Sequence, residues 1–187
     1  MKVYLASTSP RRRQLLTQLG IPFEVIEPQF EERLTSMSTA DEALYFSEQK
    51  ARSVEKLCPN ALIIGSDTLI ECNGIKMGKP NSKKEAIQML QKLSGTTHHL
   101  FTAVVLLNTK TDKIKKHVEK VLVTFRELSE KEIQDYVASG EAMGKAGAYA
   151  IQEKGKAFVR KVEGELEAVV GLPLKILRKW LEQGKLL

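Results

Sequence analysis

The stretch Leu5–Leu16 reads LASTSPRRRQLL and places three consecutive arginines just after a cluster of hydroxyl residues. The hydroxyl residues can cap a helix that starts at Pro10, because proline suits the first helical position. Arginine is unfavourable beside the positive end of the helix dipole unless an anion is bound there. Free backbone N–H groups and guanidinium groups both bind phosphate oxygens. We therefore expect Ser7, Arg11 and Arg12 to hold a polyphosphate; the open alternative is a solvated basic turn.

Asp67 follows the apolar run Ala61–Gly65, which predicts a central strand. We expect Asp67 at the carboxyl end of that strand, where ligand sites of α/β sheets gather. A carboxylate in that place can act as a general base or as a metal ligand. The residues also allow the alternative of a turn-forming aspartate that bonds its own backbone.

Other charged residues carry weaker signals. Glu31 and Glu32 lie in a polar stretch that predicts a loop, where paired carboxylates either hold a hard cation such as Mg²⁺ or form a solvated surface. Lys50 and Lys79 are single lysines, and such residues are usually exposed. Lys79 lies within the tight sequence GKP, which favours a defined position.

The histidines and cysteines do not predict a metal centre. His98 and His99 open a predicted strand with no third ligand nearby in sequence, so we expect them on the surface or partly buried. Cys58 and Cys72 form no CxxC pair, which argues against zinc and favours two reduced thiols.

Strand and helix patterns mix along the chain, with a long predicted hairpin in the middle. This order predicts an α/β fold with a mixed, curved β-sheet flanked by helices. Asn73-Gly74 predicts a tight hairpin, and Ser82 with Glu85 predicts a capping box. The strands are expected at 2–6, 23–26, 61–65, 99–108, 117–126 and 158–162, and the helices at 10–19, 40–57, 82–93, 129–140 and from 173.

The composition is that of an ordinary globular protein. A length of 187 residues suits one domain or two small lobes that share a core. The net charge of +6 favours an anionic partner but is too mild and too spread out to require nucleic acid. No signal peptide or membrane span fits the sequence, so we expect a cytoplasmic protein with no membrane partner.

Ten segments in fixed order extend almost from end to end. They are LASTSPRRRQLL (5–16), FEVI (23–26), EQKARSV (48–54), GSDT (65–68), GKP (78–80), LSGTTHHLFTAV (93–104), VTFREL (123–128), YVASGE (136–141), KAGAYAIQ (145–152) and VVGLPL (169–174). Their joint order and spacing resemble the Maf family of nucleoside triphosphate pyrophosphatases. Within that family, the SPRR, SDT and AYAIQ segments are similar to the branch that acts on dTTP and UTP.

The resemblance implies a single Maf-like domain over 1–187, related to the inosine triphosphate pyrophosphatases, with two lobes and a central cleft. It implies hydrolysis of a nucleoside triphosphate to the monophosphate and pyrophosphate with a divalent metal, Mg²⁺ or Mn²⁺. It also implies a homodimer.

Two other functions stay open for this sequence. One is a non-catalytic nucleotide-binding regulator of division and septum formation, and the other is an RNA-binding module.

The resemblance also implies roles for individual residues. Asp67 matches the catalytic proton acceptor, and Glu32 and Asp67 match metal-binding carboxylates. The matches to the phosphate clamp are Arg11, Arg12, Lys50 and Lys79, and those tied to substrate choice are Arg11, Thr68 and Gln152.

One loop departs from the family pattern. The family usually has GEPxDKAG, whereas this chain has GEAMGKAG, with Ala142 in place of the proline and Gly144 in place of the aspartate. Residues 153–155 read EKG where a glycine often follows the glutamine. If the family aspartate orders the loop or holds metal, we expect this protein to be slower or to need more metal.

Overall fold

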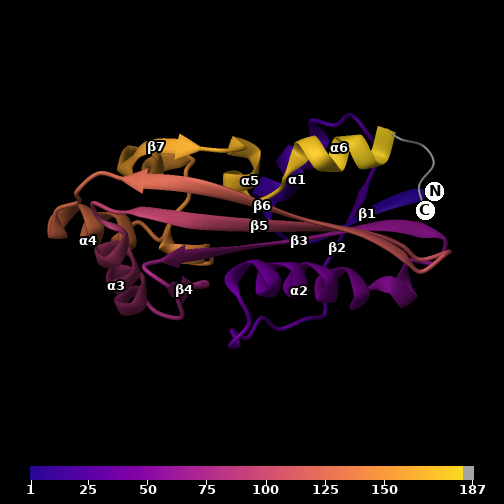
Figure 1. Cartoon of the computed structure of the whole chain (residues 1–187), viewed down its shortest axis with the longest axis horizontal. Helices are drawn as coiled ribbons and strands as arrows, with labels where there is room; N and C mark the ends of the chain where they lie inside the picture. Colours follow the sequence, from indigo (N-terminus) through magenta and orange to yellow (C-terminus); the bar gives the residue numbers. More distant parts are fainter. Residues whose placement is uncertain (183–187) are drawn as a thin grey trace. The chain divides into compact units, whose positions relative to one another are not determined.

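The computed structural model describes residues 1–182 (Figure 1). The chain forms two compact units. The first comprises Met1–Asp67, Thr102–Glu119 and the segment from Gly171, and the second comprises Thr68–Phe101 and Lys120–Val170.

The described residues form one seven-stranded sheet in the order β2-β1-β3-β5-β6-β7, with β4 paired to β3. Strand β1 pairs in parallel with β2 and β3, whereas β3–β4 and β6–β7 are antiparallel. The predicted mixed sheet is therefore confirmed. The strands are β1 Lys2–Ala6, β2 Glu24–Ile26, β3 Ala61–Cys72, β4 Ile75–Met77, β5 Thr97–Asn108, β6 Lys113–Phe125 and β7 Val159–Glu163.

The helices match the predicted ones, apart from the short helix α5, which was not predicted from the sequence. The predicted helix 40–57 ends earlier, at Arg52, and a 3₁₀ turn follows it. The helices are α1 Pro10–Thr17, α2 Thr39–Arg52, α3 Lys83–Leu93, α4 Glu130–Ala138, α5 Leu166–Val170 and α6 Leu174–Glu182, with 3₁₀ turns η1 Glu55–Leu57, η2 Ala146–Ala148 and η3 Glu153–Phe158. None of the helices within residues 1–182 has the length and apolar character needed to cross a membrane.

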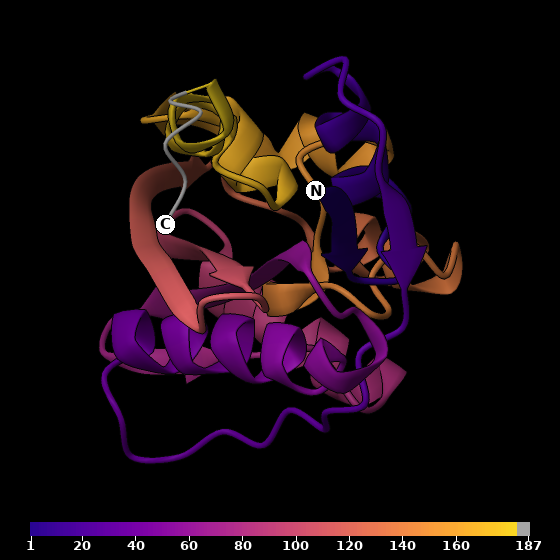
Figure 2. The same ribbon diagram turned by 90° about the vertical axis from the view of Figure 1, so that its right-hand side faces the viewer.

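In the first unit, α2 covers one face of the strands, and α1 and α6 lie on the other face (Figures 1 and 2). Gly65 on β3 allows α2 to approach closely, because a Cβ atom there would lie 2.1 Å from the backbone oxygen of Ser47. The Ser47 hydroxyl donates to Ala43 O at 2.7 Å within α2 and contacts Ala103 O on β5 at 3.2 Å. These contacts fix the helix that carries Lys50 against the strand that carries Asp67.

The second unit has its own apolar core, in which the rings of Phe125, Tyr149 and Phe158 pack edge to face. His98 is 1% exposed and its Nε2 lies 2.8 Å from the Tyr149 hydroxyl, so the expectation of a surface or partly buried His98 was wrong. The apolar residues around the strand exclude water from its ring. His99, the next residue, is half-buried, as expected.

Local turn and cap predictions hold for the most part. Asn73 and Gly74 have φ values of 50° and 74° and join β3 to β4, as the hairpin signal predicted. Ser82 caps α3, but the Glu85 carboxylate accepts the backbone N–H of Asn81 at 2.7 Å, so only half of that predicted capping box forms.

Candidate active site

Asp67 lies inside β3, which continues to Cys72, so the prediction that it follows the end of the strand was wrong. The parallel pairing of β1 with β3 does end at Ala6 and Gly65, two residues before Asp67. β3 continues past that point as a neighbour of β5 in the sheet and pairs with β4 from Ile70 to Cys72, so the backbone stays extended where a turn was possible. Asp67 is therefore a buried strand residue, 2% exposed, beside the end of the parallel ladder.

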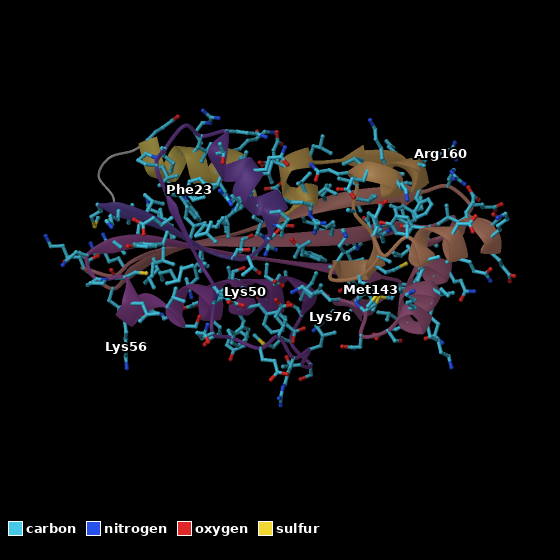
Figure 3. The ribbon with its side chains drawn as sticks, turned by 180° about the vertical axis from the view of Figure 1, so that it is seen from behind. Phe23, Lys50, Lys56, Lys76, Met143 and Arg160 are labelled. Atoms are coloured by element: carbon cyan, nitrogen blue, oxygen red, sulfur yellow. The ribbon has the colours of Figure 1, made fainter. Side chains whose placement is uncertain are left out.

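Lys50 joins the two predicted metal-binding carboxylates. Its Nζ contacts Asp67 Oδ1 and lies 2.6 Å from Glu32 Oε1. Lys50 is 5% exposed in its side chain, so the sequence-based expectation of an exposed lysine was wrong. In Figure 3, Lys50 lies where α2 faces the sheet, whereas Lys56 points away from the ribbon. The structure thus brings three predicted site residues into contact.

Helix α1 brings Arg12 to the same cluster. Ser9 caps the helix by accepting the backbone N–H of Arg12 at 3.4 Å, and Ser7 accepts the N–H of Ser9 at 3.2 Å. The Arg12 Nε donates to Gly171 O at 2.8 Å. Arg11 is half-buried, like Arg12, whereas Arg13 is exposed.

Ser66 and Gly171 extend this arrangement and were not identified from the sequence. The Ser66 hydroxyl contacts Ala103 O at 2.7 Å and Gly171 O at 3.0 Å. The Gly171 carbonyl therefore accepts from both Ser66 and Arg12. The GSDT and VVGLPL segments that carry these residues belong to the family pattern, which was the available signal.

Burial and charge act together on Asp67. Burial raises the pKa of Asp67 above its ordinary value, and the Glu32 carboxylate also raises it, whereas the cations of Lys50 and Arg12 lower it. Burial lowers the pKa of Arg12, and the carboxylates of Asp67 and Glu32 oppose that shift. Asp67 thus combines high proton affinity with two nearby cations, the setting expected of a general base.

The residues present fit a hard divalent cation. Asp67 Oδ2 is buried and accepts no hydrogen bond from the described residues, so it can still accept a ligand. Residues 1–182 contain no group of three or more His, Cys, Asp or Glu side chains placed to hold a metal. Two carboxylates suit Mg²⁺, which is commonly bound by one or two carboxylates together with substrate phosphates and water.

Thr68, Lys79 and Gln152 belong to the second unit, so their predicted roles stay predictions. Thr68 is half-buried on β3, and Lys79 is exposed directly after Gly78, whose carbonyl accepts the N–H of Gly147 at 3.0 Å. Gln152 is half-buried and immediately precedes η3.

The divergent loop also lies in the second unit. Gly144 is exposed with φ 71°, and no atom lies within 4 Å of a Cβ built on it. Glu153 adopts φ 60°, the left-handed conformation that favours the glycine often found after the family glutamine.

A family model described as "Maf-like protein" matches residues 2–184. The chain belongs to the Maf family. A Maf relative from Bacillus anthracis named "dTTP/UTP pyrophosphatase" is 42% identical over 183 residues, which cover 97% of this chain and 95% of the relative. A protein of the same name from Carboxydothermus hydrogenoformans is 42% identical over 184 residues, which cover 96% of this chain and 99% of that protein.

One solved structure has a similar fold. The Staphylococcus aureus Ham1 protein aligns over 99% of this chain and 100% of its own, with a TM-score of 0.53 and 15% identity. At that identity the likeness concerns the fold alone. It agrees with the expected relation to the inosine triphosphate pyrophosphatase fold; the central cleft and the single domain over 1–187 stay predictions.

Proposed function

We propose that this Maf protein is a dTTP/UTP pyrophosphatase, which hydrolyses these pyrimidine nucleotides and related modified ones to the monophosphate and pyrophosphate. The observation that carries the proposal is the buried contact of Lys50 with Asp67 and Glu32, to which α1 adds Arg12. The cluster occurs in a chain that is 42% identical to relatives of that name over nearly its full length.

The chemistry requires a base and several positive charges. Water attacks the α-phosphorus, the bond to the bridging oxygen breaks, and pyrophosphate leaves with added negative charge. In the proposed reaction, Asp67 accepts the proton of the attacking water. Arg11 and Arg12 supply positive charge for the phosphate oxygens.

Glu32 and Asp67 would hold the divalent cation that the family implies, Mg²⁺ or Mn²⁺. When bound, such an ion neutralises charge on the phosphate oxygens. Lys50 contacts both carboxylates and so holds them together as a counter-ion. Its role in the proposed phosphate clamp then requires its ammonium group to turn from the carboxylates toward a phosphate.

Residues of the second unit supply the proposed base selectivity. Gln152 offers both a donor and an acceptor, which a pyrimidine edge with O4 and N3–H can pair. A wrong base would leave these polar groups unpaired, which discriminates strongly. Thr68 and Arg11 complete the proposed specificity set, and Lys79 adds a cation for the phosphates.

The experiment is pyrophosphate release from dTTP, UTP, CTP, GTP, 7-methyl-GTP and ITP, each with Mg²⁺ or Mn²⁺ and with metal removed by chelation. Turnover that favours dTTP and UTP and disappears on chelation supports the proposal. Binding of triphosphate without turnover of any substrate would instead support the non-catalytic regulator. Sedimentation of the purified chain tests the proposed homodimer.

A further inference from the structure

Glu32 lies in a segment with no regular secondary structure. Between β2 and α2, residues 27–38 form neither helix nor strand, and in Figure 2 this segment runs along the outer side of α2. Fixing each backbone residue of such a segment has an entropic cost, which its contacts must offset. Contacts on both sides of Glu32 offset this entropic cost.

The first set of contacts lies on the N-terminal side of Glu32. The ring of Phe30 packs against two aromatic rings of α2, with centroids 6.1 Å from Tyr45 and 5.7 Å from Phe46. The backbone N–H of the preceding residue, Gln29, donates to the Ser53 hydroxyl at 3.0 Å. Phe46 is 1% exposed, so Phe30 packs against the part of α2 that is itself held in the core.

The second set lies on the C-terminal side. The Glu42 carboxylate, 0% exposed and in the first turn of α2, accepts the backbone N–H of Thr35. Thr35 in turn accepts the N–H of Met37 at 3.2 Å, and Ser38 caps α2. A charged acceptor makes a stronger hydrogen bond than a neutral one, and burial strengthens it further.

The residues between these contacts point outward except for Glu32. Glu31 and Arg33 are exposed and pair with each other at 2.8 Å, and Leu34 is 49% exposed. Glu32 alone in this stretch is partly buried, 22% exposed, and contacts Lys50. The five residue steps from Phe30 to Thr35 span at most about 18 Å, so fixing both ends restricts where Glu32 can lie.

We propose that Phe30 and Glu42 are positioning residues that fix Glu32 beside Lys50 and Asp67 and thereby set the affinity of the site for a divalent cation. The metal part rests on the proposed function. The positioning part is independent of it, because it concerns contacts within the chain itself.

The test uses two readouts on the full chain. Trypsin cleavage after Arg33, identified by mass spectrometry under native conditions, reports opening of the segment, since cleavage follows the population of the open form. Calorimetric titration with Mn²⁺ reports cation binding without turnover. The variants are Glu42→Leu, which removes the acceptor, Glu42→Gln, which keeps one, and Phe30→Ala, which lies outside any helix or strand.

In Glu42→Leu and Phe30→Ala, we expect cleavage after Arg33 to be roughly tenfold faster and the dissociation constant for Mn²⁺ roughly tenfold higher. This is the scale of one lost hydrogen bond to a charged group for Glu42, and of lost aromatic packing for Phe30. Glu42→Gln should remain near wild type in both the cleavage rate and the dissociation constant for Mn²⁺. Glu48→Gln is the matched control, because Glu48 lies on the same helix but pairs with Arg52 and Lys116 instead of the segment.

Unchanged cleavage, or faster cleavage with unchanged Mn²⁺ affinity, in both Phe30→Ala and Glu42→Leu would overturn the proposal. Urea unfolding of each variant separates global loss of stability, which would accelerate cleavage at many sites, from local opening. If the wild type binds no Mn²⁺ and hydrolyses no triphosphate, the proposed function fails, and the cleavage rate alone then decides the positioning role.

Discussion

The ammonium group of Lys50 on α2 contacts the carboxylate of Asp67 on β3, with the two side chains 5% and 2% exposed. The same ammonium group lies 2.6 Å from Glu32. One buried cation thus contacts two carboxylates and offsets part of their mutual repulsion. This arrangement makes Lys50 a structural element of the site as well as a candidate phosphate ligand.

Replacing Lys50 with methionine should lower the free energy of unfolding by about 3–5 kcal/mol, because it leaves the buried Asp67 and the partly buried Glu32 without that cation. Added Mn²⁺ should restore part of that loss. Urea denaturation with and without metal measures both effects. The control is Lys2→Met, which breaks an exposed pair with Glu24 and should leave stability unchanged. Equal effects of the two substitutions would contradict the account.

Gly65→Ala should destabilise the protein by about 3 kcal/mol and reduce turnover, since its Cβ would lie 2.1 Å from the backbone oxygen of Ser47, which cannot move without α2. Moving α2 shifts Lys50 relative to Asp67. Thermal unfolding and pyrophosphate release measure the two effects. Gly144→Asn is the matched control, because nothing lies within 4 Å of a Cβ there and asparagine tolerates the left-handed backbone.

His98 should make stability depend on pH. Burial lowers its pKa from 6.5 to about 4, with a smaller contribution from His99. Between these values the unfolded chain binds a proton that the folded chain does not, so the folded state loses stability as pH falls from 6.5 toward 4. The loss attributable to His98 is about 3 kcal/mol.

Urea denaturation from pH 7 to pH 4 checks the His98 prediction. In His98→Asn, the loss of unfolding free energy between pH 6.5 and pH 4 should be smaller by the part that His98 contributes. In His99→Asn, a substitution at a half-buried position, the loss should remain as in the wild type. Parallel slopes for wild type and His98→Asn would show that another group carries the dependence.

Gly144→Asp restores the residue that the family loop usually has. Because the position is exposed, open and at φ 71°, where aspartate is tolerated, stability should change by no more than about 1 kcal/mol. We expect the substitution to lower the metal concentration needed for half-maximal pyrophosphate release. An unchanged metal requirement would show that this chain does not use a carboxylate at that position.

Features set by neighbouring residues could be predicted from the sequence. The cap and proline at the start of α1, and the Asn73-Gly74 hairpin, depend on contacts within a few residues. The family pattern then indicated Asp67, Lys50 and Glu32 as site residues, and the structure brings them into contact.

Features set by contacts between distant residues could not be predicted from the sequence. Asp67 lies in a strand whose sheet neighbours, β1 and β5, are distant in sequence, and His98 is buried by rings far along the chain. The packing of Phe30 on Tyr45 had no signal in the sequence pattern, because a single aromatic residue in a polar stretch does not reveal its partner.

The most direct test of the central claim compares wild type with Asp67→Asn in two measurements on one triphosphate: pyrophosphate release from dTTP with Mg²⁺, and binding of a non-hydrolysable dTTP analogue. Release should fall by at least about a hundredfold, the usual scale for losing a general base, while binding is largely kept. Release that continues near the wild-type rate in Asp67→Asn would contradict the assignment of Asp67 as the base.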